Sequence, residues 1–279
     1  WMITGTPIQN RMSDLFAICH VLGFQDTLYS KPEGIEEITQ KAMLRRTKVS
    51  VGIEIPKLIT EHIVVKWHSD ASKTLADELH SVARSRSNNG FSEGILNDVA
   101  NMPAALNLVK MIRSKQMCVL PKMLKCKAQD YYGEGFFDED YAKDTFSAVS
   151  ESSKLDAVFD TINENGTNGN KKIVFCHFRM EMDELKKRIE DIGLATAIVD
   201  GRVTGKKRNE LLAQDNLDVL ILQINTCCEG LNLQTFNEIY FVSPHWNPAV
   251  EDQAVARAHR IGQTKDVKVF RYFMEGLDD

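Results

Sequence analysis

Short apolar runs alternate with helix-like segments through the second half of this sequence. Runs rich in β-branched and aromatic residues predict strands at Lys172–Phe178, Ala195–Asp200, Val219–Gln223, Phe236–Ser243 and Val267–Met274. Between the first two runs, Met182, Leu185 and Ile189 recur at helical spacing before Gly193. Strands that alternate with helices form a parallel sheet flanked by helices, so we predict an α/β fold.

The segment after the run that ends at Ser243 predicts a helix. Asn247 suits the N-cap, Pro248 the first helical position and Gly262 the stop. The apolar stripe that we expect to pack on the sheet comprises Val250, Ala254, Ala258 and Ile261.

Three polar residues are predicted to share a neighbouring face of this helix. Gln253, Arg257 and Arg260 are four and then three residues apart, which places them side by side on a helix. Taken alone, this spacing is typical of a solvated face.

Further polar groups follow three of the predicted strands. They are CHFR at Cys176–Arg179, DGR at Asp200–Arg202 and INT at Ile224–Thr226. The carboxyl ends of parallel strands meet at one edge of a sheet, where such folds bind their ligands.

The first half of the chain is less regular. Residues 69–125 read as mostly helical. Residues 126–150 interleave aromatic with acidic side chains, for which we favour a surface loop over a peptide-docking or autoinhibitory element. The acidic charge there has the wrong sign for nucleic acid.

Composition and charge narrow the function classes. The 279 residues are 43% hydrophobic and 26% charged, as in an ordinary globular protein. A net charge of -5 argues against a protein that coats nucleic acid, but it allows a small basic groove that grips phosphates. The 6 cysteines include no C-x-x-C pair, so we predict neither a zinc site nor a disulfide framework.

Several strings resemble one known family. GLNLQ, SPHWNPAVEDQA and RAHRIGQT, in this order, closely resemble motifs V and VI of the Swi/Snf-like ATPases, which are double-stranded-DNA translocases of helicase superfamily two. MITGTPIQN, at Met2–Asn10, resembles motif III. The resemblance implies the C-terminal part of a tandem RecA-like helicase core. Residues 1–67 would end the first lobe, residues 68–150 would form a helical insertion and residues 151–279 the second lobe.

The resemblance also implies an ATP site with Mg²⁺. In phosphoryl transfer, positive charge is placed against the γ-phosphate, and Arg257 and Arg260 match the family's arginine-finger positions. The residues expected beside the nucleotide and the lobe interface are Gly230, Asn232 and Gln253. The motif III residues expected to couple this site to DNA are Gly5, Thr6, Gln9 and Asn10.

Duplex DNA is the partner that the resemblance implies. The family positions that face its backbone are here His177, Arg179, Arg202, Asn225 and Thr226. His177 fits equally well as a strand-end histidine whose hydrogen bonds are satisfied inside the fold. Both interpretations stay open at this point.

The sequence thus predicts an ATP-dependent double-stranded-DNA translocase that remodels chromatin or other protein–DNA complexes, or acts in DNA repair. Nucleosomes or other DNA-bound proteins would be further partners, and the location would be the nucleus or a viral factory. The G-x-x-x-x-G-K-[ST] loop and the acidic magnesium-binding motif do not occur here, so we expect them, with most ATP ligands, upstream of Trp1. A strand-separating DNA or RNA helicase and a non-enzymatic DNA-binding module are the alternatives.

Overall fold

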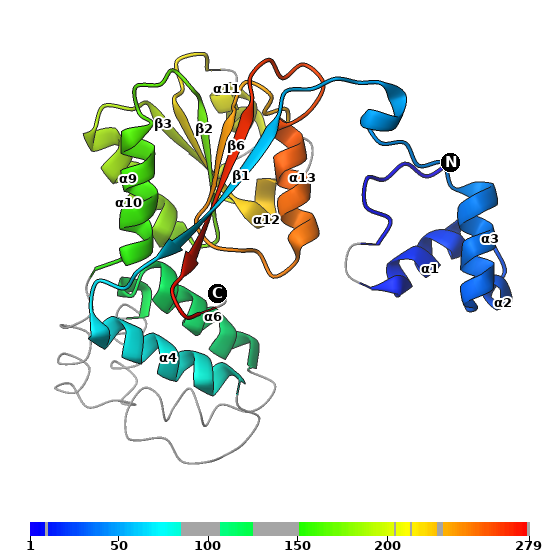
Figure 1. The fold of residues 1–279 in the computed structure, drawn as a ribbon, viewed down its shortest axis with the longest axis horizontal. Helices are drawn as coiled ribbons and strands as arrows, with labels where there is room; N and C mark the ends of the chain where they lie inside the picture. Colours follow the sequence, from blue (N-terminus) through cyan, green and yellow to red (C-terminus); the bar gives the residue numbers. More distant parts are fainter. Residues whose placement is uncertain are drawn as a thin grey trace.

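A six-stranded, wholly parallel sheet forms the centre of the computed structural model, in the order β1-β6-β5-β2-β4-β3 (Figure 1). Its strands are β1 (Leu58–Val65), β2 (Lys172–Cys176), β3 (Thr196–Val199), β4 (Val219–Gln223), β5 (Glu238–Phe241) and β6 (Val267–Met274). The structure describes residues 1–8, 11–84, 107–124, 151–203, 205–212, 214–227 and 231–277. The predicted parallel α/β sheet is confirmed, and each of the five predicted strands is present.

Helices cover both faces of the sheet (Figure 1). One face carries α9 (Ser153–Glu164) and α10 (Arg179–Asp191), with α4 (Asp70–Arg84) and α6 (Asn107–Val119) continuing the same core. The other face carries α11 (Gly205–Leu212), α12 (Ile224–Cys227) and α13 (Pro248–Ala258). None of the described helices has the length and apolar character needed to cross a membrane.

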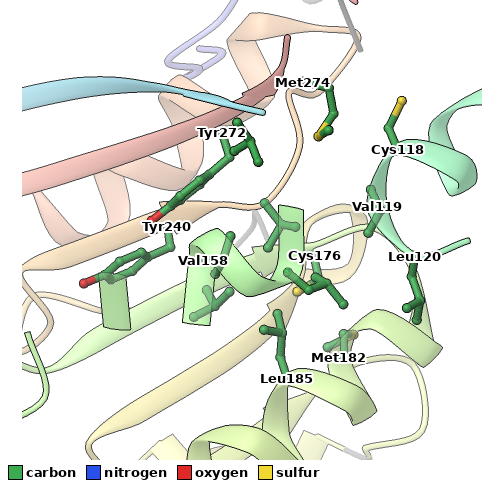
Figure 2. Close-up of a cluster of buried hydrophobic side chains, with 14 of the residues drawn as sticks. Cys118, Val119, Leu120, Val158, Cys176, Met182, Leu185, Tyr240, Tyr272 and Met274 are labelled. Atoms are coloured by element: carbon green, nitrogen blue, oxygen red, sulfur yellow. The ribbon is translucent and has the colours of Figure 1, made fainter. Parts of the chain in front are cut away.

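Successive residues of the central strands enter different cores. Cys176 points into the core under α9 and α10, together with Val158, Leu185 and Tyr272 (Figure 2). Phe175 enters the opposite core under α13 and stacks on the Phe241 ring, with ring centroids 5.0 Å apart. This alternation explains why these strands are apolar throughout, since both of their faces are buried.

A small helical group precedes the sheet. It comprises α1 (Met12–Val21), α2 (Asp26–Tyr29), α3 (Pro32–Ala42) and the 3₁₀ turn η1 (Val49–Val51). The three α-helices have a core of their own, formed by Leu15, Cys19, Tyr29 and Ile38.

Strand β1 lies inside the segment 1–67, which the sequence assigns to the first lobe. It pairs with β6 over its whole length, from Leu58 beside Val267 to Val65 beside Met274. Most of its side chains are exposed because it is an edge strand. The predicted boundary at residue 67 therefore falls after a strand that belongs to the sheet of residues 151–277.

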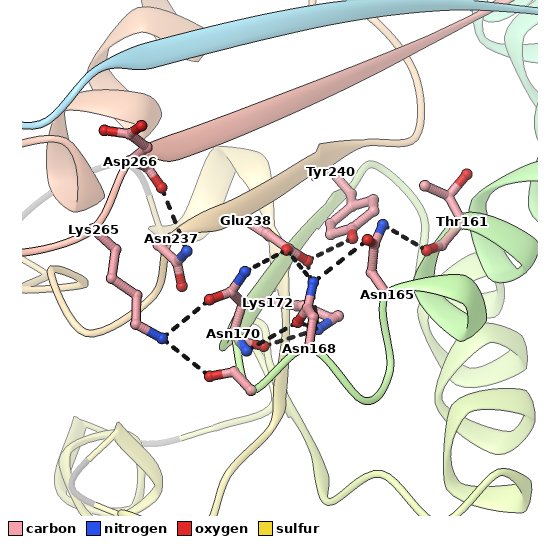
Figure 3. Close-up of polar contacts among 11 residues, drawn as sticks. Thr161, Asn165, Asn168, Asn170, Lys172, Asn237, Glu238, Tyr240, Lys265 and Asp266 are labelled. Atoms are coloured by element: carbon pink, nitrogen blue, oxygen red, sulfur yellow. Dashed lines mark hydrogen bonds and ion pairs between the residues drawn. The ribbon is translucent and has the colours of Figure 1, made fainter.

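A buried ion pair joins the amino ends of β2 and β5 (Figure 3). Lys172 Nζ lies 3.4 Å from Glu238 Oε2, and the Tyr240 hydroxyl donates to the same carboxylate at 2.9 Å. Asn168 and Asn170 donate to the other carboxylate oxygen at 2.7 and 2.9 Å. The loop before β2 is thus fastened to β5 at the edge opposite the polar strand ends.

Candidate nucleotide and DNA site

Helix α13 begins as predicted but ends early. The Asn247 side chain accepts the Ala249 N–H at 3.0 Å, and Pro248 occupies the first turn. The helix stops at Ala258, because His259 has ψ 74, outside the helical range. The predicted extension to Gly262 is wrong. Ile261, predicted to belong to the buried stripe, is 62% exposed.

Arg260 therefore lies in a loop rather than on the helix. Arg257 is half-buried in the last turn, whereas Arg260 is exposed. The prediction that Gln253, Arg257 and Arg260 share one helical face is wrong for Arg260. This loop leads into the amino end of β6, so the two arginines lie at the edge of the sheet opposite the polar strand ends.

Long-range hydrogen bonds hold the loop from outside. Lys48 Nζ donates to the His259 carbonyl at 2.6 Å, and the His259 ring Nε2 lies 2.7 Å from the Pro56 carbonyl oxygen. Burial lowers the pKa of Lys48, and the nearby charge of Arg260 lowers it further. The segment of residues 43–57, which precedes β1 and is called the crossing segment below, thus contacts both the carbonyl and the ring of His259.

The turn after Arg260 is built by its own sequence. Gly262 has φ +99, a backbone conformation that favours glycine, and a Cβ at this position would lie 2.9 Å from Gln234 Oε1, so that flexible side chain would have to shift. The buried Gln263 amide donates to the Phe236 carbonyl at 3.0 Å and accepts the Thr264 N–H at 2.9 Å. The HRIGQT string therefore forms a fixed turn.

The structure brings a residue predicted for coupling and a residue predicted for the lobe interface together. Gln253 Nε2 donates to Thr6 Oγ1 at 2.7 Å, and the Thr6 N–H donates to Thr4 Oγ1 at 3.1 Å. Gly5 lies beside this contact in open space, with no atom within 4 Å of a built Cβ. Gln9 and Asn10, predicted to belong to the same element, lie outside the described residues.

The segment predicted beside the nucleotide runs along the end of α13. The Leu233 N–H donates to the Arg257 carbonyl at 3.2 Å, and the exposed Asn232 immediately precedes Leu233 in the chain. Gly230 lies outside the described residues. Thr6, Gln253, Asn232 and Arg257 thus form one connected region.

At the carboxyl edge of the sheet, Arg179 and Arg202 meet at one carboxylate. Asp200, fully buried at the end of β3, accepts Arg202 Nε at 2.7 Å and lies 4.0 Å from Arg179 Nε. Arg202 also donates to both oxygens of Asp183, at 3.0 and 3.3 Å. Arg202 is therefore held by two carboxylates, whereas the Arg179 side chain is 60% exposed.

His177 is turned into the fold. Its ring Nε2 lies 3.2 Å from the Ser243 carbonyl oxygen, and the ring stacks on His245 with centroids 5.7 Å apart. Burial lowers the pKa of His177 to about 3, with the charge of Lys115 as the next cause. Of the two interpretations left open by the sequence, this geometry agrees with the satisfied strand-end histidine.

Asn225 is exposed and contacts His245, the ring on which His177 stacks. His245 Nε2 lies 3.1 Å from Asn225 Oδ1, while the Asn247 N–H donates to His245 Nδ1 at 3.1 Å. Both contacts suit a neutral imidazole, and burial lowers the pKa of His245. Thr226 continues α12, and its side chain is outside the described part of the structure.

Ionisable groups that are buried or half-buried lie beneath this edge. Lys154 Nζ donates to Ser243 Oγ at 3.2 Å, and Lys115 Nζ donates to the Pro244 carbonyl. Burial lowers the pKa of Lys154 to about 7 and that of Lys115 to about 8, and it raises the pKa of Glu181 to about 7. The 243–245 turn is thus fixed from α6 and α9.

Four residues at these sites were not among those predicted. Asp200 and His245 sit inside the DGR and SPHWNP strings, so their motifs already marked the place. Glu251, in the first turn of α13, is buried, accepts the His245 N–H at 2.7 Å and pairs with Arg271 at 2.8 Å. Lys48 had no local signal, because its partner lies 211 positions away.

The arrangement can bind anions at two separate places. The arginine loop presents one exposed guanidinium and one half-buried guanidinium, which suit phosphate oxygens. The carboxyl edge presents Arg179 with the neutral donor Asn225, which suits a sugar–phosphate backbone. No three His, Cys, Asp or Glu side chains among the described residues gather in a way that could hold a metal ion.

Comparison with known proteins gives a consistent result. Residues 153–262 match the helicase conserved C-terminal domain. An uncharacterized ATP-dependent helicase of Mycoplasma genitalium is 30% identical over 96% of this chain and 25% of its own length. The chromodomain-helicase-DNA-binding protein 1-like of Danio rerio is 28% identical over 97% of this chain and 26% of its own. The chain spans about a quarter of the length of these relatives.

Solved structures share the fold. The C-terminal part of the Fun30 ATPase domain matches 80% of this chain and 87% of its own, with 17% identity and a TM-score of 0.60. The Sulfolobus solfataricus SWI2/SNF2 ATPase core in complex with dsDNA matches 98% of this chain and 57% of its own, with 22% identity and a TM-score of 0.55. Residues 153–262 thus match a helicase C-terminal domain, and the fold is that of the C-terminal part of solved Swi/Snf-type ATPases, in agreement with the resemblance seen in the sequence.

Proposed function

We propose that this protein uses ATP hydrolysis to translocate along double-stranded DNA, and so remodels protein–DNA complexes or acts in DNA repair. One observation carries the proposal: the 2.7 Å hydrogen bond from Gln253 to Thr6. It joins the segment that resembles motif III to the helix that carries Arg257. A translocase needs such a contact, because the state of the nucleotide must be transmitted to the surface that holds DNA.

We assign Arg257 and Arg260 to the γ-phosphate. Charge on that group is redistributed during transfer, and a guanidinium supplied across a cleft stabilises it. Arg260 is free to serve a phosphate on the opposite lobe because it is exposed in a loop. Gln253, Asn232 and Gly230 would line the lobe interface. ATP would arrive with Mg²⁺, whose ligands we expect in the remainder of the ATPase core.

We assign DNA binding to the carboxyl edge, with Arg179 and Asn225 in direct contact with the backbone and Arg202 and Thr226 beside them. His177 would support the edge from inside rather than bind. The solved SWI2/SNF2 core with dsDNA supports duplex DNA as the partner class. Nucleosomes or other DNA-bound proteins, and a nuclear or viral setting, belong to the same proposal.

We further propose that the second lobe begins before Leu58 rather than after residue 67, with residues 68–150 as an insertion within it. The pairing of β1 with β6 supports this boundary. Residues 1–57 would then be the end of the first lobe, which would place Thr6 and Gln253 on opposite sides of the lobe interface.

ATP hydrolysis by the intact protein, measured with and without duplex DNA, tests the proposal. Duplex DNA should stimulate hydrolysis, and the protein should displace a third strand from a triplex without separating the duplex. Efficient duplex unwinding would favour the helicase alternative. Duplex binding without any DNA-stimulated hydrolysis would favour the non-enzymatic binding module.

A further inference from the structure

We propose that Lys48 and His259 are positioning residues that set where Arg260 points, an inference that rests on the proposed role of Arg260. The two residues link the loop after α13 to the crossing segment that precedes β1. Neither is proposed to touch the nucleotide. Their effect on hydrolysis would pass through the arginine.

The geometry limits the conformations of this loop. The helix ends at Ala258, so helical hydrogen bonding does not fix the direction of Arg260. The His259 carbonyl belongs to the peptide that enters Arg260, and Lys48 Nζ holds this carbonyl at 2.6 Å. The His259 ring is held at the same time by the Pro56 carbonyl at 2.7 Å. The peptide and the side chain of one residue are thus fastened to a single segment.

The charges favour a positioning role over direct binding. Burial lowers the pKa of Lys48 and the charge of Arg260 lowers it further, so the two side chains lie close together. The Lys48 ammonium donates to a neutral carbonyl. A like-charged neighbour also keeps the guanidinium from folding back toward the crossing segment. We therefore expect the exposed Arg260 guanidinium to point away from Lys48.

The link also joins the two lobes that we propose. Lys48 follows the helical group of residues 12–42, whereas His259 follows the helix that covers the sheet. If residues 1–57 move with the first lobe, a change in their position would be carried to the Arg260 peptide through this hydrogen bond. The Thr6–Gln253 contact would act in parallel at the middle of the same helix.

A set of variants in the intact protein tests the inference. Lys48→Met removes the donor but keeps much of the side-chain length, and Lys48→Arg restores a donor. Lys57→Met is the matched control, because Lys57 lies in the same segment but uses its backbone N–H, which donates to Asp266 at 2.8 Å. His259→Phe keeps a planar ring and removes the bond to Pro56.

Lys48→Met should lower kcat about tenfold to a hundredfold, since a displacement of about 1 Å can cost that much. KM for ATP and the thermal midpoint should change little, because a misdirected finger weakens the transition state more than ground-state binding. Lys48→Arg should recover most of the rate, Lys57→Met should behave as wild type, and His259→Phe should resemble Lys48→Met.

The decisive readout is the double variant with Arg260→Ala. If Lys48 acts through Arg260, Lys48→Met should have almost no further effect on kcat in that background. A full additional loss there would overturn the inference while leaving the proposed function intact. If Arg260→Ala itself leaves kcat unchanged, both the finger assignment and the positioning inference are wrong. A loss in Lys48→Met that tracks a lower thermal midpoint would also overturn the inference, since the residue would then be structural.

Discussion

Replacing Arg179 with alanine should weaken duplex binding by the contribution of one phosphate contact to the affinity. The Arg179 side chain is 60% exposed at the start of α10, and its nearest carboxylate, Asp200, lies 4.0 Å away. This distance leaves most of its hydrogen-bonding capacity for a ligand. The side chain is therefore the better of the two arginines at this edge for a phosphate.

The magnitude follows from counterion release. Each phosphate neutralised contributes about 0.9 to the slope of log K against log salt, so Arg179→Ala should reduce that slope by about 0.9. Over a fourfold rise in salt concentration, this single contact accounts for a change of about 3.5-fold in duplex affinity. The loss should be equal for duplexes of different sequence, because phosphate contacts carry no base information.

Arg202 should behave differently, although it carries the same charge. Its guanidinium is already bound by Asp183 at 3.0 Å and by Asp200 at 2.7 Å. Arg202→Ala should therefore change the slope less than Arg179→Ala does. Asp183→Asn, which removes one of the competing carboxylates, should raise affinity and steepen the slope.

Filter binding over a salt series, with the intact protein and duplexes of equal length, measures these slopes. Lys187→Ala is the matched control, because Lys187 is an exposed cation further along α10, away from the strand ends. If Arg179→Ala leaves the slope unchanged while Lys187→Ala lowers it, the DNA surface has been assigned to the wrong part of α10. A clear preference for one duplex sequence would also contradict the reasoning.

Three predictions concern stability. Glu238→Gln should lower the free energy of unfolding by about 3–5 kcal/mol, because Lys172 would be left buried without its partner charge; denaturant unfolding measures this, and a loss under about 1 kcal/mol would count against it. Burial lowers the pKa of Lys154 from 10.5 to about 7, so the unfolded chain holds the extra proton between these values and the thermal midpoint should rise with pH there. Lys154→Met should flatten this rise, and an unchanged pH profile would refute the assignment. Burial lowers the pKa of His177 from 6.5 to about 3, so His177→Gln should lose less stability than wild type as pH falls through that window, which thermal scans at several pH values would detect.

The sheet could be predicted from the sequence because its central strands are buried on both faces. Continuous apolar runs such as VLILQ at Val219–Gln223 are typical of strands buried on both faces. Strand β1 gave no such signal. Its residues Leu58–Val65 include polar side chains, as expected for an edge strand, and only the pairing with β6 defines it.

The conformation of the arginine segment could not be predicted from the sequence. The motif strings predict which segment carries the arginines, yet helical spacing placed Arg260 on a helix that ends two residues before it. The helix ends where His259 makes contacts with Lys48 and Pro56, which lie about two hundred positions earlier in the chain. A local pattern cannot register contacts of this range, and tertiary contacts override helix propensity at such positions.

The charge at the carboxyl edge of the sheet shows the same limit. Spacing placed Arg179 and Arg202 correctly at the ends of β2 and β3, but it did not indicate that Asp183 approaches from the first turns of α10. Of the two arginines predicted to supply positive charge here, Arg202 is therefore largely neutralised. Side-chain partners across elements determine the usable charge of a site, whereas a sequence motif specifies only its residues.

The rate of ATP hydrolysis by Arg260→Lys in the intact protein, at saturating ATP and duplex DNA, tests the central claim most directly. Lysine keeps the charge but loses the planar, two-pronged donor. Since an arginine finger is worth about 10³ to 10⁵ in rate, kcat should fall by at least about tenfold, with the thermal midpoint and duplex affinity close to wild type. A near-wild-type kcat would contradict the account, because the exposed arginine of the loop would then not serve the γ-phosphate.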